Sequence, residues 1–189
     1  MPYPAQTDYQ TIVQTARTLI EQEGLEQLSL ARLAATLGIK APSLYGHIAN
    51  KSALLKAVIV QTYELLFAAY SRALSEAGDD PKARLLALLR AHRAFAHANP
   101  STYMLAFTTT APEQRMNQQA LEQLALPIQE LMAALVGAER SLTALRGALA
   151  LVHGFVMLEL NEQLQRGGDL SAAFDESIQA YLSGWQRSA

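Results

Sequence analysis

The sequence predicts an all-α protein of about nine helices. Apolar residues recur every three to four positions through most of the 189 residues, which is the spacing of a helix face. Alternating apolar and polar runs bounded by turn residues, the pattern typical of strands, are nearly absent. Half of the residues are apolar, so the chain can bury a core of its own.

The first helix is predicted over residues 8–23. Its apolar residues fall on one stripe, and Gly24 can supply the left-handed conformation that ends a helix. The stripe consists of Tyr9, Ile12, Val13, Ala16, Leu19 and Ile20.

Two short helices follow. Ser29 is placed to cap the first of them, and Gly38 ends it. Pro42 is tolerated in the first turn of a very short next helix, from which Leu44 and Ile48 can reach inward. Two short helices joined by a tight turn are typical of a helix-turn-helix, whose second helix enters the DNA major groove.

A long helix is then predicted from the Asn50 cap to about Glu76, before a break at residues 78–81. It belongs to both halves of the chain. Later Pro and Gly residues mark the predicted boundaries between further helices. These are predicted at roughly 82–98, 100–107, 113–125, 127–137, 141–166 and 171–187.

Residues 42–55, PSLYGHIANKSALL, carry the most specific motif: Tyr-x-His-aliphatic-x-Asn-Lys-x-x-Leu. With the Gly38 turn, this motif resembles the TetR family of bacterial transcriptional regulators over about residues 8–56. Residues 148–160 contain the pair His153-Gly154 in a late helix, which resembles more loosely a subset of that family.

The resemblance implies a helix-turn-helix domain over residues 1–56 and a helical effector-binding and dimerisation domain over residues 57–189. It further implies a homodimer formed through the last two helices, in keeping with the small residues of the first and the apolar stripe of the second. Such a dimer would place two recognition helices on the two half-sites of a double-stranded DNA operator. We expect a repressor that a small molecule releases from its operator, with a tilt of the long fourth helix as the link.

By resemblance, Tyr45, His47 and Lys51 contact phosphate oxygens, and Pro42 and Ser43 lie against bases or sugars. Hydroxyl, imidazole and ammonium groups and helix N-termini all bind phosphates, so the residue types suit these roles.

Four other positions need separate interpretation. Ser29 and Arg32 could reach the flanking backbone, although Ser29 could instead act only as a cap. The family often has Ser or Thr before the recognition helix, whereas this chain has Lys40. Lys40 is our candidate for the residue that recognises the base sequence of the DNA. Gly46 stands where many members carry a larger residue, so fewer base contacts are expected.

Aromatic, His and Met residues of the later helices belong to a core by default, but the same residue types line ligand cavities in helical bundles. The resemblance implies such a cavity among the helices from the fourth to the eighth. The predicted effector-binding residues are Tyr63, Phe67, His92, Phe95, Tyr103, Phe107, His153 and Met157.

We predict neither a metal nor a cofactor. The chain has no Cys, and His92 and His97 are five residues apart, as His153 and Glu159 are six apart, so each pair falls on different helix faces. Recognisable catalytic motifs are also lacking. The alternatives are an all-helical enzyme or small-molecule-binding protein with an incidental helix-turn-helix, and a sequence-independent DNA-binding protein.

Charge is distributed unevenly but weakly. Residues 1–56 contain five basic and four acidic side chains, and the rest of the chain contains ten and thirteen. The start of the chain lacks the pattern of a signal peptide, and the most apolar stretch, residues 147–160, is too short to span a bilayer. A cytoplasmic protein without a membrane partner is therefore expected.

Overall fold

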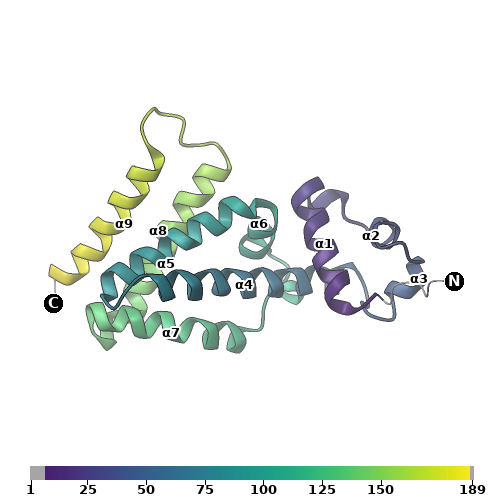
Figure 1. Cartoon of the computed structure of the whole chain (residues 1–189), viewed down its shortest axis with the longest axis horizontal. Coiled ribbons are helices and arrows are strands. Elements are labelled where there is room, and N and C mark those ends of the chain that lie inside the picture. Colours follow the sequence, from purple (N-terminus) through teal and green to yellow (C-terminus); the bar gives the residue numbers. More distant parts are fainter. Residues whose placement is uncertain (1–6, 188–189) are drawn as a thin grey trace. The chain divides into compact units, whose positions relative to one another are not determined.

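The computed structural model describes residues 7–187, and in that range the chain forms nine α-helices, two 3-10 turns and no strand (Figure 1). The prediction of an all-α fold is confirmed. The elements are α1 (Tyr9–Glu23), η1 (Leu25–Gln27), α2 (Leu30–Thr36), α3 (Ala41–Leu44), α4 (Lys51–Glu76), α5 (Pro81–Ala98), α6 (Pro100–Thr108), η2 (Pro112–Gln114), α7 (Gln118–Val136), α8 (Ala138–Leu160) and α9 (Leu170–Arg187).

The helices pack into two compact units. Unit 1 comprises the chain as far as Leu65 together with Asn99–Asn117, so it holds α1 to α3, the first part of α4, and α6. Unit 2 comprises Leu66–Ala98 and the chain from Gln118 onward. The domain boundary at residue 56, which rests on the sequence alone, stays a prediction. In the structure, packing places α6 in the same unit as the helix-turn-helix.

Unit 1 has one apolar core to which all of its helices contribute. Ile12 and Ile20 of α1, Leu33 of α2 and Leu44 of α3 are each 0% exposed. The stripe predicted for the first helix is buried except for Tyr9, which is 50% exposed. Burial of this stripe holds the short helices in place, because helices of four or seven residues are not stable by themselves.

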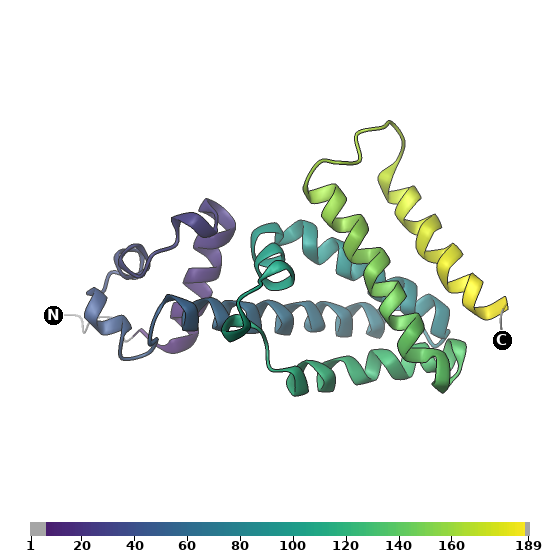
Figure 2. The same ribbon diagram turned by 180° about the vertical axis from the view of Figure 1, so that it is seen from behind.

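Unit 2 is a bundle in which α7 packs on α8, and α5 and α9 pack on both. Figure 2 shows α8 and α9 as antiparallel neighbours joined by the loop at residues 161–169. Where the two helices approach, the Tyr181 hydroxyl donates a hydrogen bond to the Ala144 carbonyl at 2.8 Å. Gly147 makes this approach possible, because a Cβ at that position would lie 2.1 Å from the Tyr181 oxygen.

Two helices predicted at 113–125 and 127–137 are wrong. Pro112–Gln114 forms only a 3-10 turn, and α7 runs unbroken from Gln118 to Val136 with Pro127 inside it. A proline removes one backbone hydrogen bond and disfavours a helical residue before it. Packing of α7 on α8 and α5 outweighs this local preference.

The predicted helix at 141–166 has the wrong bounds. Gly137, with φ of +85°, ends α7, and α8 begins at once with Ala138. α8 ends at Leu160, where the Asn161 side chain donates to the Met157 carbonyl at 2.7 Å and Glu162 adopts φ of +53°. The helix therefore ends at Leu160, well before the glycine pair at 167–168.

By length and composition alone, two described helices could cross a membrane: α4 and α8, each of which contains an 18-residue stretch with a mean hydropathy of 1.4 and 1.5, respectively. The argument that the apolar stretch in α8 is too short does not hold for the whole helix of 23 residues. Core helices of soluble proteins meet the same test, and each helix supplies buried residues to the units described above. The absence of a membrane partner stays a prediction.

Candidate DNA-binding surface and effector site

The helix-turn-helix is built from caps and a turn that the sequence predicted. The Ser29 hydroxyl accepts a hydrogen bond from the Arg32 amide at 3.1 Å, which caps α2. After α2, Gly38 has φ of +68°, a conformation that glycine adopts without a steric cost. The Ile39 amide then donates to the Ala34 carbonyl at 3.0 Å and closes the turn.

α3 is a single helical turn. Lys40 lies at its cap position without a side-chain capping bond, and Leu44 and Ile48 are buried as predicted. The amides of His47 and Ile48 donate to the Leu44 carbonyl at 2.9 and 2.8 Å, so the backbone turns sharply after α3. This turn leaves the Tyr45 side chain 58% exposed.

α4 begins beside this turn. The Asn50 side chain accepts from the Ala53 amide at 2.8 Å and caps the helix, as predicted, while the Lys51 side chain is exposed. A positively charged side chain at a helix N-terminus is suited to an anion such as phosphate. All of the predicted DNA-contacting residues are exposed on unit 1: Ser29, Arg32, Lys40, Pro42, Ser43, Tyr45, His47 and Lys51.

Two carboxylates near this surface were not predicted from the sequence to take part in it. Glu23 at the end of α1 accepts two bonds from the Arg32 guanidinium, at 2.8 and 2.6 Å. These bonds lower the pKa of Glu23 and raise that of Arg32. Asp8 caps α1 through the Thr11 amide at 2.7 Å, which lowers its pKa, and attraction to His47 adds to this effect.

Three predicted effector-binding residues lie in unit 1 and contact one another. The Tyr103 and Phe107 rings stack with centroids 4.4 Å apart, and Tyr63 lies 5.2 Å from Phe107. Burial raises the pKa of Tyr63 and takes that of Tyr103 further up, beyond its ordinary range. These rings join α4 to α6 within unit 1.

The other five predicted effector-binding residues lie in unit 2. His92 is 2% exposed, and its Nδ1 lies 2.5 Å from the Tyr70 hydroxyl, a partner that sequence reasoning did not name. Burial lowers the pKa of His92 to about 4, with a contribution from nearby His153, whose pKa burial also lowers. Both imidazoles are therefore neutral at neutral pH. Phe67 packs edge-on against Tyr70, Phe95 is buried, and Met157 is half-buried.

Comparison with known proteins finds matches both to the helix-turn-helix and to the later helices. Residues 12–58 match the family model described as bacterial regulatory proteins, tetR family. Residues 85–181, more than half of the chain, match the model of the tetracyclin repressor-like C-terminal domain. The chain belongs to the TetR family. It is a DNA-binding transcriptional regulator with a helix-turn-helix, which confirms the class of function predicted from the motif at residues 42–55.

Individual proteins also resemble this chain along most of its length. An uncharacterized HTH-type transcriptional regulator, YobS of Bacillus subtilis (strain 168), is 28% identical over 92% of this chain and 90% of that protein. The structure of a single-residue TetR variant from Acinetobacter baumannii AYE in complex with minocycline has a TM-score of 0.71 and 23% identity, covering 96% and 98% of the two chains. BioQ with its double-stranded DNA operator has a TM-score of 0.65 and 22% identity, covering 96% and 99%. The two structures support the TetR-like fold.

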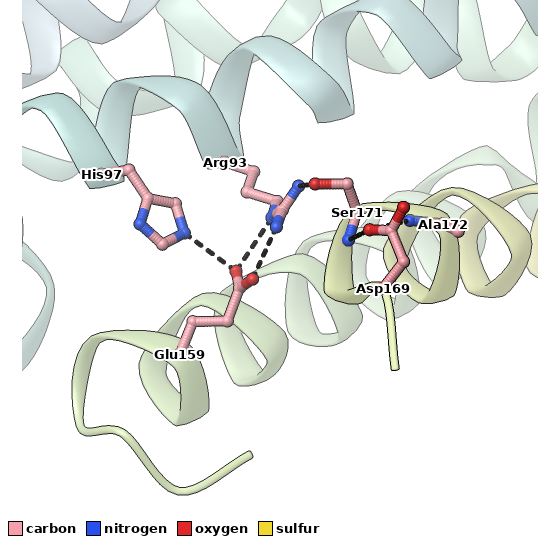
Figure 3. A network of polar contacts seen from close by, with 6 residues as sticks. All are labelled: Arg93, His97, Glu159, Asp169, Ser171 and Ala172. Atoms are coloured by element: carbon pink, nitrogen blue, oxygen red, sulfur yellow. Dashed lines mark hydrogen bonds and ion pairs between the residues drawn. The ribbon is translucent and has the colours of Figure 1, made fainter. Parts of the chain in front are cut away.

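Unit 2 of this TetR-family chain contains a polar network that spacing did not predict (Figure 3). Glu159, whose side chain is 4% exposed, accepts two bonds from Arg93 at 2.9 and 2.6 Å and contacts His97 Nε2 at 2.9 Å. Burial opposes the charge of Glu159, but the bonds from Arg93 and His97 outweigh it and lower the pKa. Arg93 also donates to the Ser171 hydroxyl at 3.2 Å, which ties α5 to both α8 and α9.

A pocket of about 360 Å³ opens beside the network, between α5 and α9. None of the eight predicted effector-binding residues lines it. Its lining residues are Arg90, Arg93, Ala94, His97, Ser171, Phe174 and Asp175. Arg90 is held by Asp175 at 2.8 Å, and Arg93 by Glu159, so the arginines of this pocket are already paired.

Proposed function

We propose that this TetR-family regulator is a homodimeric repressor that leaves a palindromic operator when a small molecule binds its C-terminal helices. The observation that carries the DNA-binding part is the group of exposed Tyr45, His47 and Lys51 around the turn between α3 and α4. Similar proteins support both ligands, since BioQ is known with its operator and the Acinetobacter protein with minocycline. Because its target is DNA, we place the protein in the cytoplasm.

At the operator, Tyr45, His47 and Lys51 hold phosphate oxygens, and Lys40 contacts a base edge or a phosphate beside it. Pro42 and Ser43 lie against bases or sugars, and Ser29 stays near the flanking backbone while its hydroxyl caps α2. Phosphate contacts set position and orientation, whereas base contacts carry specificity. Lys40 therefore determines more of the specificity than Lys51 does.

Arg32 has a different part in this proposal. Its guanidinium binds Glu23 in the free protein, so a phosphate has to share or replace that carboxylate. Guanidinium groups have five N–H donors, and the two bonds to Glu23 leave others for a phosphate. Arg32 thus supports the turn first and contacts DNA second.

The effector binds through uncharged groups. His92 and His153 are neutral at neutral pH, and His92 is joined to Tyr70, so this region offers imidazole and hydroxyl groups among aromatic rings. Such surroundings favour a largely apolar molecule with a few hydrogen-bonding groups. Phe67, Phe95 and Met157 contribute the apolar contacts from unit 2. The rings of Tyr63, Tyr103 and Phe107 belong to unit 1, and their contact with the effector stays a separate prediction.

Dimerisation uses the outward faces of α8 and α9. Phe174, Ile178 and Leu182 are buried within unit 2, so they do not remain available for a partner. Leu142 and Leu158 of α8 are 41% and 39% exposed. Small exposed residues on the same two helices allow close approach of a second copy: Ala150, Ala172, Ala173 and Ala180.

Selection of duplexes from a random pool, followed by competition with random DNA, tests the proposed function. A specific regulator should enrich a palindrome that random DNA competes for poorly. A library of small molecules is then screened for release of the selected duplex. Equal competition by random DNA would contradict a specific operator, and the absence of any releasing molecule would contradict an induced repressor.

A further inference from the structure

α6 is a member of unit 1 whose two chain connections both lead to unit 2. It follows α5 directly, since α5 ends at Ala98 and α6 begins at Pro100. After α6 the chain returns to unit 2 at Gln118. Because only Asn99 separates α5 from α6, a displacement of the end of α5 acts on α6 through the covalent chain.

Glu21 of α1 caps the N-terminus of α6. Its carboxylate accepts hydrogen bonds from the amides of Ser101 and Thr102 at 3.0 and 2.8 Å, and also from the Thr102 hydroxyl. The first amides of a helix have no partner within the helix, and a helix N-terminus favours a negative charge. The side chain of Asn99, at the cap position itself, makes no capping bond. The capping charge of α6 thus comes from a residue 80 positions away.

A second contact strengthens the attachment of α6 to α1. Arg17, one helical turn before Glu21, donates to the side-chain oxygen of Asn99. Residues four apart lie on one face of a helix, so this face of α1 binds both sides of the α6 start. Leu105 and Ala106 of α6 lie in the same apolar core as the buried residues of α1.

α1 in turn holds the DNA-binding elements. The buried residues Leu33 of α2 and Leu44 of α3 share the core of unit 1 with Ile12 and Ile20. A movement of α6 that keeps its cap must therefore carry α1, and α1 must carry α2 and α3 or give up that core. Packed cores transmit such displacements because they have few voids to absorb them.

We propose that Glu21 is a positioning residue that couples α6 to the orientation of the helix-turn-helix on DNA. This inference rests on the proposed function, and it adds a route through α6 and α1 to the tilt expected of α4. Coupling between sites is reciprocal, so operator binding must favour the capped state of α6 as much as that state favours operator binding.

Amide hydrogen exchange read by NMR on the full-length dimer tests this coupling, with a duplex selected from a random pool as the probe. The amides of Ser101 and Thr102 report the cap directly, because their hydrogen-bond acceptor is Glu21. We expect the duplex to slow their exchange about fivefold in the wild-type protein. In Glu21→Gln their exchange should rise about tenfold, and the affinity for the duplex should fall about fivefold.

Glu26→Gln is the matched control, since it removes the same charge from an exposed residue of η1 in the same unit. It should leave exchange of both amides unchanged. Equal duplex affinities of Glu21→Gln and Glu26→Gln, or wild-type amides unaffected by the duplex, would overturn this inference alone. The wild-type measurement needs no variant, so misfolding of Glu21→Gln would not protect the inference. Failure to select any duplex would overturn the proposed function and, with it, this inference.

Discussion

The proposed DNA-binding surface of unit 1 and the interior of unit 2 use polar side chains in opposite ways. Tyr45 and Lys51 are exposed to solvent around the turn that ends α3. His92 and the Glu159 side chain are nearly inaccessible and are hydrogen-bonded to other helices. Exposed groups lose hydration only when a ligand arrives, whereas buried groups lose it on folding. Substitutions at the surface should therefore change binding, and those in the interior should change stability.

Arg32 and Glu21 qualify this comparison. Arg32 belongs to the proposed DNA-binding surface but is already engaged by Glu23, and Glu21 holds α6 within unit 1. Each joins elements that are distant along the chain. A substitution at either residue should affect both stability and DNA binding.

Acidification should destabilise the protein most strongly through His92. Because the folded pKa of about 4 lies below the ordinary value of 6.5, the unfolded state takes up the proton first as the pH falls. The contribution of His92 to the free energy of unfolding is therefore at its maximum above pH 6.5. Between pH 6.5 and 4 the free energy of unfolding falls by about 3 kcal/mol. Urea unfolding at several pH values measures it. His92→Gln keeps a polar partner for Tyr70 without titrating, and a pH profile parallel to that of the wild type would contradict this prediction.

Two glycines of α8 should respond oppositely to alanine. A Cβ at Gly147 would collide with Tyr181 and displace its hydroxyl from the Ala144 carbonyl, whereas a Cβ at Gly154 meets no atom within 4 Å. Gly154→Ala should stabilise by about 0.5–1 kcal/mol through helix propensity. Gly147→Ala should be less stable than Gly154→Ala by about 1–2 kcal/mol, as measured by thermal unfolding. Equal effects would show that α9 does not pack closely on α8.

Lys51→Ala should weaken binding to all duplexes alike, about fivefold at moderate salt, and reduce the salt slope by about one unit. The reason is the loss of one phosphate contact without loss of a base contact. Fluorescence anisotropy across a salt series measures both quantities. The free energy of unfolding of Lys51→Ala should stay within about 0.5 kcal/mol of the wild-type value. Arg72→Ala, an equal charge loss at an exposed site further along α4, should keep the slope. An unchanged slope for Lys51→Ala would remove Lys51 from the phosphate contacts.

Lys40→Ala should have the smallest effect on affinity but should alter the preferred sequence. Lys40 lies at the cap position of the recognition helix α3. Its exposed side chain makes no capping bond and is therefore available to a base edge. Selection from a random pool with Lys40→Ala and with Lys51→Ala separates the two roles. Only Lys40→Ala should return a changed motif, and recovery of the wild-type motif would refute the assignment.

Local chemistry made much of unit 1 predictable. The caps Ser29 and Asn50 and the glycine turns after α1 and α2 act within a few residues of their own position. Each preference is therefore visible in a short stretch of sequence. The same reasoning failed at Pro127, where a strong local signal was outweighed by packing of the whole helix α7.

The predicted effector-binding residues were harder to select. Apolar and aromatic residues of a helical bundle look alike in sequence whether they fill a core or line a cavity. Tyr70 was missed although it follows Phe67 by three residues on α4, and only its contact with His92 distinguishes it. Glu159 was considered solely with respect to metals, whereas Arg93 from another helix accounts for its burial.

The sequence by itself determined the all-α class, the helix-turn-helix and the exposed residues of its motif, because periodicity, caps and turns depend on near neighbours along the chain. Only the tertiary structure decided that α6 belongs with the DNA-binding helices, that Glu21 caps it, and that Arg32 and Arg93 meet their carboxylates. These pairs are formed by residues that lie on different elements, up to 81 positions apart. Their partners are selected by packing of the apolar faces, which no local pattern encodes.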